Sequence, residues 1–181
     1  MTPAPEMYSR TAITLHWILA ILLATMIGLG LYMTDIPRNT PERSWFFNLH
    51  KSLGLLTASI ILLRVAWRLR FKPPGLERLA PPWQVAVAKT SHAALYACML
   101  FMPLTGYLGS SFNKYGVKFF GLALPHWGWD DPKLREIFVT AHEWIADLFI
   151  ALIAIHVVAA AYHALRRDGV FARMWLGAFA R

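Results

Sequence analysis

The segment TAITLHWILAILLATMIGLGLYMT, from Thr11 to Thr34, contains no Asp, Glu, Lys or Arg. A helix needs about 20 consecutive apolar residues to cross the hydrocarbon layer of a membrane, so this segment is long enough to do so. Arg10 precedes it, as a basic residue precedes the core of a signal peptide, but the apolar run is too long for such a core and no small-residue cleavage site follows. We expect a retained transmembrane helix.

Three further apolar segments follow, at about residues 47–69, 88–112 and 138–165. The second is framed by Lys51 and Arg64, and the fourth carries two histidines. Together with the first, at about 11–34, they predict an all-α integral membrane protein, a four-transmembrane-helix bundle that forms a single membrane domain over residues 1–181.

The composition agrees with a membrane protein. Of the 181 residues, 57% are hydrophobic and only 15% are charged, whereas about a quarter of the residues in a soluble domain are charged. The one cysteine, Cys98, excludes an intramolecular disulfide, a four-cysteine zinc site and an iron–sulfur cluster held by this chain alone. The absence of a C-x-x-C-H motif excludes covalent c-type haem.

The formal charge of +8 is better explained by membrane orientation than by nucleic acid, for which there is no motif. Four spans place both termini on the same side, and the side richer in Lys and Arg is expected to be cytoplasmic and to contact anionic lipid. Eleven of the 18 basic residues fall on the side of the termini. These are Arg10, Arg64, Arg68, Arg70, Lys72, Arg78, Lys89, Arg166, Arg167, Arg173 and Arg181.

The histidines are concentrated within or at the ends of the spans. His142 and His156 are fourteen residues apart, which places them on nearly the same face of one helix, about 21 Å apart along its axis. His50 begins the second span, at the outer level of His142, and His16 lies in the second turn of the first span, at the inner level of His156. Each level therefore contains a pair, His50 with His142 and His16 with His156.

Two pairs of histidines held across a helical bundle suit two haem irons, each with one imidazole on either side of the porphyrin. A structural zinc site would need about four ligands in one place. Because two imidazoles leave no open position on iron, this arrangement favours electron transfer over oxygen binding. Two histidines have no assigned role: His92 could replace a ligand or hydrogen-bond a propionate, a quinone or the backbone, and His126 lies in an outer loop.

Four motifs carry a resemblance to a known family. They are YSRTAITLHW from Tyr8, NLHKSLG from Asn48, MPLTGY from Met102, and AHEW from Ala141 with His156 following. This pattern resembles the bacterial cytochrome b-561 family over nearly the whole chain. The resemblance implies a bacterial inner-membrane protein with two haem b groups, whose iron ligands would be His16, His50, His142 and His156.

The same family includes proteins that oxidise superoxide and reduce ubiquinone, and relatives that serve other redox partners. We therefore expect a superoxide:ubiquinone oxidoreductase that takes electrons at the periplasmic side. Thr14 and His163 are the candidates to bind ubiquinone, and Arg64 is the candidate to pair with a haem propionate, a role also open to Arg10 and Arg68. The candidates to steer superoxide are Lys51, Lys114, Lys118 and Lys133.

Two other functions remain open at this point. In the first, the chain is a membrane cytochrome b subunit that passes electrons between a separate dehydrogenase and the quinone pool, with the same four ligands. In the second, it is a haem-free membrane scaffold or metal-ion carrier.

Overall fold

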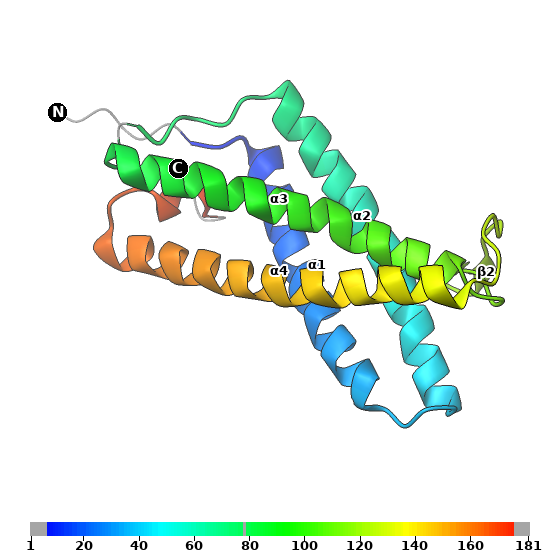
Figure 1. The fold of residues 1–181 in the computed structure, drawn as a ribbon. Helices are drawn as coiled ribbons and strands as arrows, with labels where there is room; N and C mark the ends of the chain where they lie inside the picture. Colours follow the sequence, from blue (N-terminus) through cyan, green and yellow to red (C-terminus); the bar gives the residue numbers. More distant parts are fainter. Residues whose placement is uncertain (1–6, 78, 176–181) are drawn as a thin grey trace.

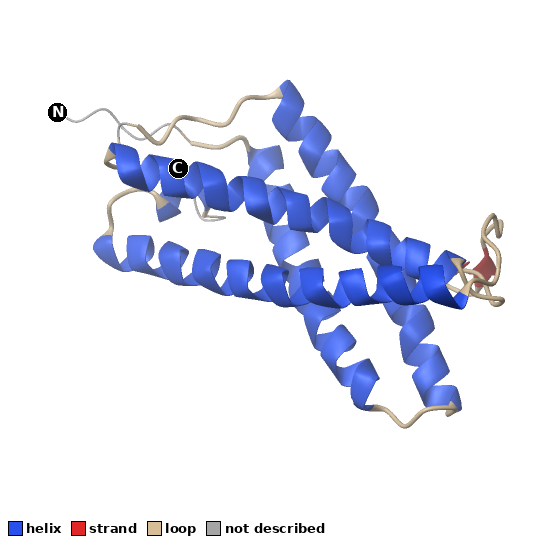
Figure 2. Cartoon of the chain, in the orientation of Figure 1, coloured by secondary structure: helices blue, strands red, loops and turns tan. Residues whose placement is uncertain are grey.

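A computed structural model describes residues 7–77 and 79–175, so Arg78 and Arg181 of the basic set lie outside the described residues. Four long helices make up most of it, as Figures 1 and 2 show. They are α1 (Arg10–Asp35), α2 (Pro41–Arg70), α3 (Pro82–Ser111) and α4 (Pro132–Arg166). Two short strands, β1 (Lys118–Phe119) and β2 (Leu122–Ala123), precede α4, and a 3-10 helix, η1 (Phe171–Met174), follows it.

Capping residues determine where three of the helices begin. The Ser9 hydroxyl accepts the Ala12 amide at the start of α1, and the Thr40 hydroxyl accepts the Arg43 amide at the start of α2. At α4 the Asp131 side chain accepts two amide N–H groups, which satisfies donors that have no partner inside the helix. Helices α2, α3 and α4 each have proline in their first turn, a position where its missing N–H costs nothing. These three helices each begin about six residues before the apolar span that the sequence predicts within them.

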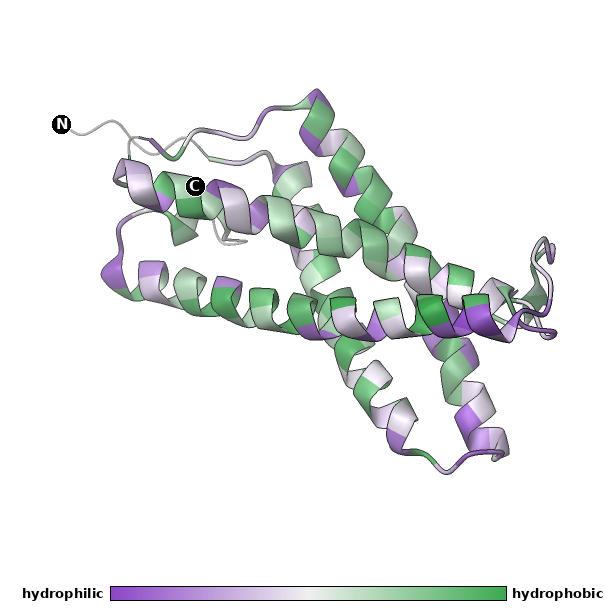
Figure 3. Ribbon diagram, viewed as in Figure 1, coloured by the Kyte–Doolittle hydropathy of each residue, from purple (hydrophilic) through white to green (hydrophobic). Residues whose placement is uncertain are grey.

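Within residues 7–77 and 79–175, four helices are long and apolar enough to cross a membrane, which confirms the predicted all-α architecture with four such helices. Many large apolar side chains are exposed. In Figure 3 the middle portions of the helices are predominantly hydrophobic. Ile21 and Val158, for example, are 66% and 69% exposed. Such exposure is costly in water and favourable against lipid tails.

The helices pack as two antiparallel pairs, α1 with α2 and α3 with α4, which cross each other in Figure 1. Helices α2 and α3 also contact one another. Buried Leu19, Ile61, Cys98, Met99 and Phe149 form the apolar centre. Since Phe149 lies midway along α4 between His142 and His156, this apolar centre separates the two levels at which the histidines lie.

The bundle has two different ends. At one, which we call the hairpin end, strands β1 and β2 pair with Lys118 opposite Ala123. This hairpin is attached to α2, because the Ser52 hydroxyl donates to the Lys118 carbonyl and accepts the Phe120 amide. At the other, which we call the η1 end, η1, the α2–α3 connection and the residues before α1 come together.

Candidate functional site

His50 and His142 face each other near the hairpin end. Their ring centroids are 6.3 Å apart, with an angle of 83° between the rings. His50 is on α2 and His142 on α4, two helices from different antiparallel pairs. The pair expected from the sequence is thus brought together by the crossing of the two helix pairs.

The ring of His142 is held in a defined orientation by α3. Its Nδ1 lies 3.0 Å from the Met102 carbonyl oxygen and 3.3 Å from the Thr105 hydroxyl. A nitrogen that close to a carbonyl carries the proton, which leaves Nε2 as the nitrogen available to a metal. Gly106 makes room for the ring, because a Cβ there would lie 3.0 Å from its Cε1 atom.

The ring of His50 has an unsatisfied nitrogen. Its Nδ1 is buried and has no hydrogen-bond partner among the described residues. Gly30 of α1 flanks the ring, and a Cβ there would lie 3.5 Å from Cε1 of His50. A buried polar atom without a partner is costly, so this nitrogen indicates a site built for a further group.

His16 of α1 and His156 of α4 form the second pair, toward the η1 end. Their ring centroids are 6.1 Å apart, with an angle of 69° between the rings. His92 of α3 adds a third imidazole, centred 5.6 Å from that of His156. Within residues 7–77 and 79–175, no cluster of three or more His, Cys, Asp or Glu side chains is arranged to hold a bare metal ion.

Arg64 of α2 is joined to the His16 pair. Its Nη2 lies 3.2 Å from Nδ1 of His16, and its Nη1 donates to the Ala12 carbonyl at 3.1 Å. The position expected from the fourteen-residue spacing of His50 and Arg64 is therefore observed: Arg64 lies at the level of the second histidine pair. Both of its contacts are with α1.

The two pairs have the spacing that one iron between two imidazoles requires. Each nitrogen–metal bond is about 2 Å long, which puts the centroids of two imidazoles on opposite sides of one metal about 6 Å apart. The observed 6.3 Å and 6.1 Å agree with that spacing. Together with the unsatisfied Nδ1 of His50 and the oriented ring of His142, the donor set fits a bis-histidine haem at each level.

His163 has a partner that the sequence did not indicate. Its Nδ1 donates to the Asp168 carboxylate at 2.7 Å. Partial burial on its own raises the pKa of Asp168, but the hydrogen bonds from His163 and the Val170 amide and the positive charge of Arg166 outweigh it, so this pKa lies below its usual value. Thr14 is exposed on α1, and no hydrogen bond joins it to His163 in the described part of the chain.

The four candidate lysines lie on the hairpin side. Lys51 follows His50 on α2, and Lys118 is tied to the same helix through Ser52. Exposed Lys114 lies over the Tyr115 ring, and Lys133 is in the first turn of α4. His126 packs against Gly116 and donates to the Ser111 carbonyl at 2.9 Å, so it holds the loop between α3 and α4.

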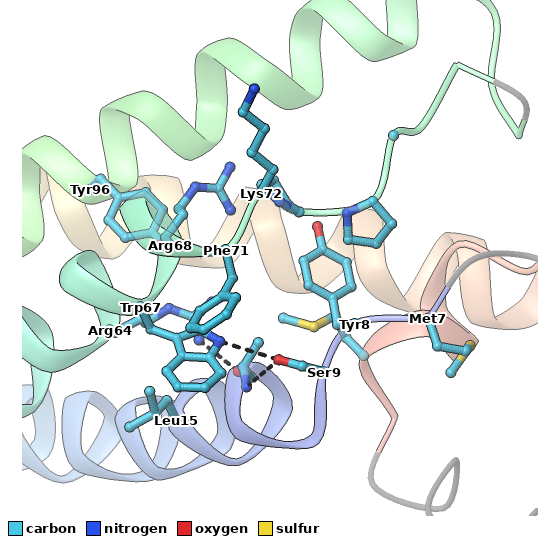
Figure 4. A pocket seen from close by; sticks show the side chains of 15 residues that line it. Met7, Tyr8, Ser9, Leu15, Arg64, Trp67, Arg68, Phe71, Lys72 and Tyr96 are labelled. Carbon is cyan, nitrogen blue, oxygen red and sulfur yellow. Dashed lines mark hydrogen bonds between the residues drawn. The ribbon is translucent and has the colours of Figure 1, made fainter.

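A cavity of about 630 Å³ opens at the η1 end, beside Arg64 (Figure 4). It lies where the start of α1, the end of α2 and the chain after α2 meet. Nothing in the sequence pattern indicated it, because its lining comes from segments far apart in the chain. Its lining includes the cationic and aromatic side chains of Tyr8, Arg64, Trp67, Arg68, Phe71, Lys72 and Tyr96.

Comparison with known proteins gives consistent matches. The family model for prokaryotic cytochrome b561 matches residues 7–177. The chain is 29% identical over 178 residues to cytochrome b561 homolog 2 of Escherichia coli (strain K12), covering 96% of this chain and 93% of that protein. It is 24% identical over 168 residues to cytochrome b561 homolog 1 of the same organism, covering 92% and 96%.

Proposed function

Since the chain belongs to the prokaryotic cytochrome b561 family of membrane electron-transfer proteins, which carry b-type haem, we propose that it oxidises superoxide and reduces ubiquinone. We further propose that it holds two haems, and that the hairpin end faces the periplasm of a bacterial inner membrane with both termini in the cytoplasm. The observation that supports this most strongly is the presence of one histidine pair at each of two levels, 6.3 Å and 6.1 Å between ring centroids.

The four histidines would hold the two haem irons, His50 with His142 and His16 with His156. Bound haem supplies reversible one-electron chemistry at iron, and two imidazoles per iron keep that chemistry outer-sphere. The protein supplies orientation: the Met102 carbonyl fixes the His142 ring so that Nε2 is the ligating nitrogen. Gly30 and Gly106 leave space beside the rings.

At the hairpin end the protein would attract superoxide, which is an anion. Lys51 adjoins His50, and Lys118 is tethered beside it through Ser52. Lys114 and Lys133 add positive charge to the surrounding surface. Together these four lysines would raise the local concentration of an anion and its encounter rate.

At the η1 end the protein would bind ubiquinone and handle protons. Two superoxide ions give up one electron each and leave as two molecules of O₂, while one ubiquinone takes up two electrons and two protons and becomes ubiquinol. Because superoxide oxidation releases no protons, both must come from the side where the quinone binds. His163, held by Asp168 at 2.7 Å, can hold a proton and present its Nε2 to a quinone carbonyl, with the Thr14 hydroxyl as a second donor.

At the same end Arg64 would pair with a haem propionate. Its guanidinium already lies beside His16, and an arginine inside the bilayer is stabilised by an anionic partner. The family's b-type haem favours this function, or that of a cytochrome b subunit fed by a separate dehydrogenase, over a haem-free scaffold or metal-ion carrier.

Steady-state turnover of the purified, haem-loaded protein tests the proposal. With excess superoxide and a short-chain ubiquinone, we expect the protein to form one ubiquinol for every two superoxide ions that it oxidises. The other product should be O₂, with no hydrogen peroxide beyond the amount that spontaneous dismutation gives. Heat-denatured protein is the control for spontaneous dismutation. Quinol formation that needs an added dehydrogenase fraction, and not superoxide, would make the chain an electron-transfer subunit.

A further inference from the structure

The cavity at the η1 end has a fixed wall. Arg173 of η1 is 3% exposed and donates to the Pro74 carbonyl at 2.7 Å. Its guanidinium also lies over the ring of Tyr8, 5.4 Å from the centroid. Both Pro74 and Tyr8 line the cavity. Arg173 thus holds two of the segments that enclose the space, so the cavity is formed before any ligand enters.

The cavity is positively charged. Arg64, Arg68 and Lys72 line it, and among the described residues no Asp or Glu lines it. The carboxylates of Glu77 and Asp168, which belong to the described residues at this end, pair with Lys89 at 2.9 Å and His163 at 2.7 Å. Neither of these ion pairs neutralises a cation of the cavity, so its charge favours an anionic ligand.

The rest of the lining is mostly apolar and includes four aromatic rings. Trp67, Phe71 and Tyr96 face the same space as the cations, as Figure 4 shows. Trp67 is fixed there by its indole N–H, which donates to the Ser9 hydroxyl at 3.2 Å. The ligand that fits such a wall has an apolar part next to its anionic group, because a fully hydrated ion would leave the aromatic surface without a partner.

The cavity also lies at the right depth for a lipid. It is formed at the end of α2 and the start of α1, where the apolar spans give way to basic and aromatic residues. Trp, Tyr, Lys and Arg gather at the headgroup level of a membrane, and basic pockets between transmembrane helices bind the headgroups of anionic lipids. A volume of about 630 Å³ is ample for a glycerophosphate headgroup.

We propose that this cavity binds the phosphate headgroup of an anionic phospholipid, with Arg68 and Lys72 on the phosphate and the aromatic wall against the glycerol and upper acyl chain. A haem propionate is the other anion within reach. It is less suited to this pair of cations, because Arg64 is the cavity residue that contacts His16, whereas Arg68 lies over Tyr96 of α3, 5.1 Å from the ring centroid. Phosphate binding by Arg68 and Lys72 does not require superoxide or quinone to react, although Arg64 in the same lining is the proposed partner of the propionate.

The chain offers a matched control for the test. Arg70 lies between Arg68 and Lys72 in sequence and carries the same charge, but it is exposed, lies over the Phe71 ring and does not line the cavity. The full-length, haem-loaded protein is exchanged into nanodiscs of phosphatidylcholine with phosphatidylglycerol as a minor component, and lipid retained after mild detergent extraction is counted by native mass spectrometry. Haem per chain is measured on the same samples.

We expect wild type and Arg70→Gln to retain phosphatidylglycerol, and the double variant Arg68→Gln/Lys72→Gln to retain at least tenfold less, with haem per chain unchanged. Equal losses in Arg70→Gln and the double variant would overturn the proposal, since general surface charge would then explain retention. Undiminished retention in the double variant would also overturn it. Loss of haem together with lipid in the double variant would assign these cations to a propionate instead.

Discussion

The Nη2 atom of Arg64 lies 3.2 Å from Nδ1 of His16. Its Nη1 atom donates a hydrogen bond to the carbonyl oxygen of Ala12. Ala12 is one helical turn before His16, so its carbonyl is the acceptor that the Nδ1–H of a ligating His16 would use. Arg64 therefore occupies the position from which the tautomer of His16 is controlled. A propionate that drew the guanidinium toward itself would release this carbonyl to His16.

Replacing Arg64 by Gln should lower the midpoint potential of the haem on the η1 side. A nearby positive charge favours the reduced, less positive iron, and its removal should shift the potential by about 60 mV, a tenfold change in the one-electron equilibrium. Redox titration followed in the visible spectrum measures this. Arg70→Gln is the control, and an equal shift in both variants would mean that Arg64 acts only through the surface charge.

The two histidine pairs should act independently. His142→Ala should reduce haem from two per chain to one and leave the His16 and His156 site occupied, because the sites lie about 21 Å apart along α4. The pyridine haemochrome assay on a per-chain basis gives the count. His126→Ala should keep both haems, since the imidazole of His126 hydrogen-bonds the Ser111 carbonyl in the loop and belongs to neither histidine pair. Loss of both haems in the folded His142→Ala protein would contradict separate sites.

Gly106→Ala should weaken the haem site near the hairpin. Its Cβ would lie 3.0 Å from Cε1 and 3.1 Å from Nδ1 of His142, and overpacking of this kind costs about 1 to 3 kcal/mol. The rate of haem transfer to apomyoglobin reports the weakening. In Gly28→Ala the added Cβ meets nothing within 4 Å, so that variant should transfer haem as slowly as wild type does.

Asp168→Asn should remove a contribution to stability that depends on pH. Because the pKa of Asp168 is lowered in the folded protein, its charged form stabilises the fold above the usual carboxyl pKa of about 4, and this stabilisation is lost as the pH falls through the lower, folded value. Thermal unfolding should therefore separate wild type from Asp168→Asn most clearly at pH 7 and less in acid. A difference that does not change with pH would exclude this explanation.

The same variant tests the quinone end. Asn offers Nδ1 of His163 only a neutral acceptor in place of the carboxylate, which stabilises the protonated imidazole less, so quinol formation should slow about tenfold. The reduction of haem by superoxide should stay at the wild-type rate, because the proposal places it at the hairpin end, away from Asp168. Slowing of both steps would show that Asp168 acts through the fold as a whole.

The helices and the histidine pairs were predictable because both follow from periodic spacing. Fourteen residues return an α-helix to nearly the same face, so His142 and His156 had to point the same way at two levels. The expected spans followed apolar length, whereas α2 and α4 begin earlier, after the caps Thr40 and Asp131, so each helix extends beyond its expected span.

The partner of His163 and the hairpin could not be read in the same way. Asp168 reaches His163 because the chain turns back after α4, with positive φ angles at Arg167 and Gly169, and a helix that continued would not bring it there. The hairpin turns at Phe120 and Gly121, both with positive φ, and phenylalanine is not among the residues that signal such a turn. Ser52 of α2 accepts a hydrogen bond from the Phe120 amide through its hydroxyl. Sequence spacing does not reveal this contact, because the two residues are far apart in the chain.

The most direct measurement is stopped-flow mixing of the oxidised, haem-loaded protein with superoxide, with absorbance followed at the haem bands. We predict rapid reduction of haem that slows as ionic strength rises, because Lys51, Lys114, Lys118 and Lys133 attract the anion, and reoxidation when a ubiquinone analogue is present. Haem that stays oxidised under superoxide, or that is reduced but not reoxidised by quinone, would contradict the proposed superoxide:ubiquinone oxidoreductase.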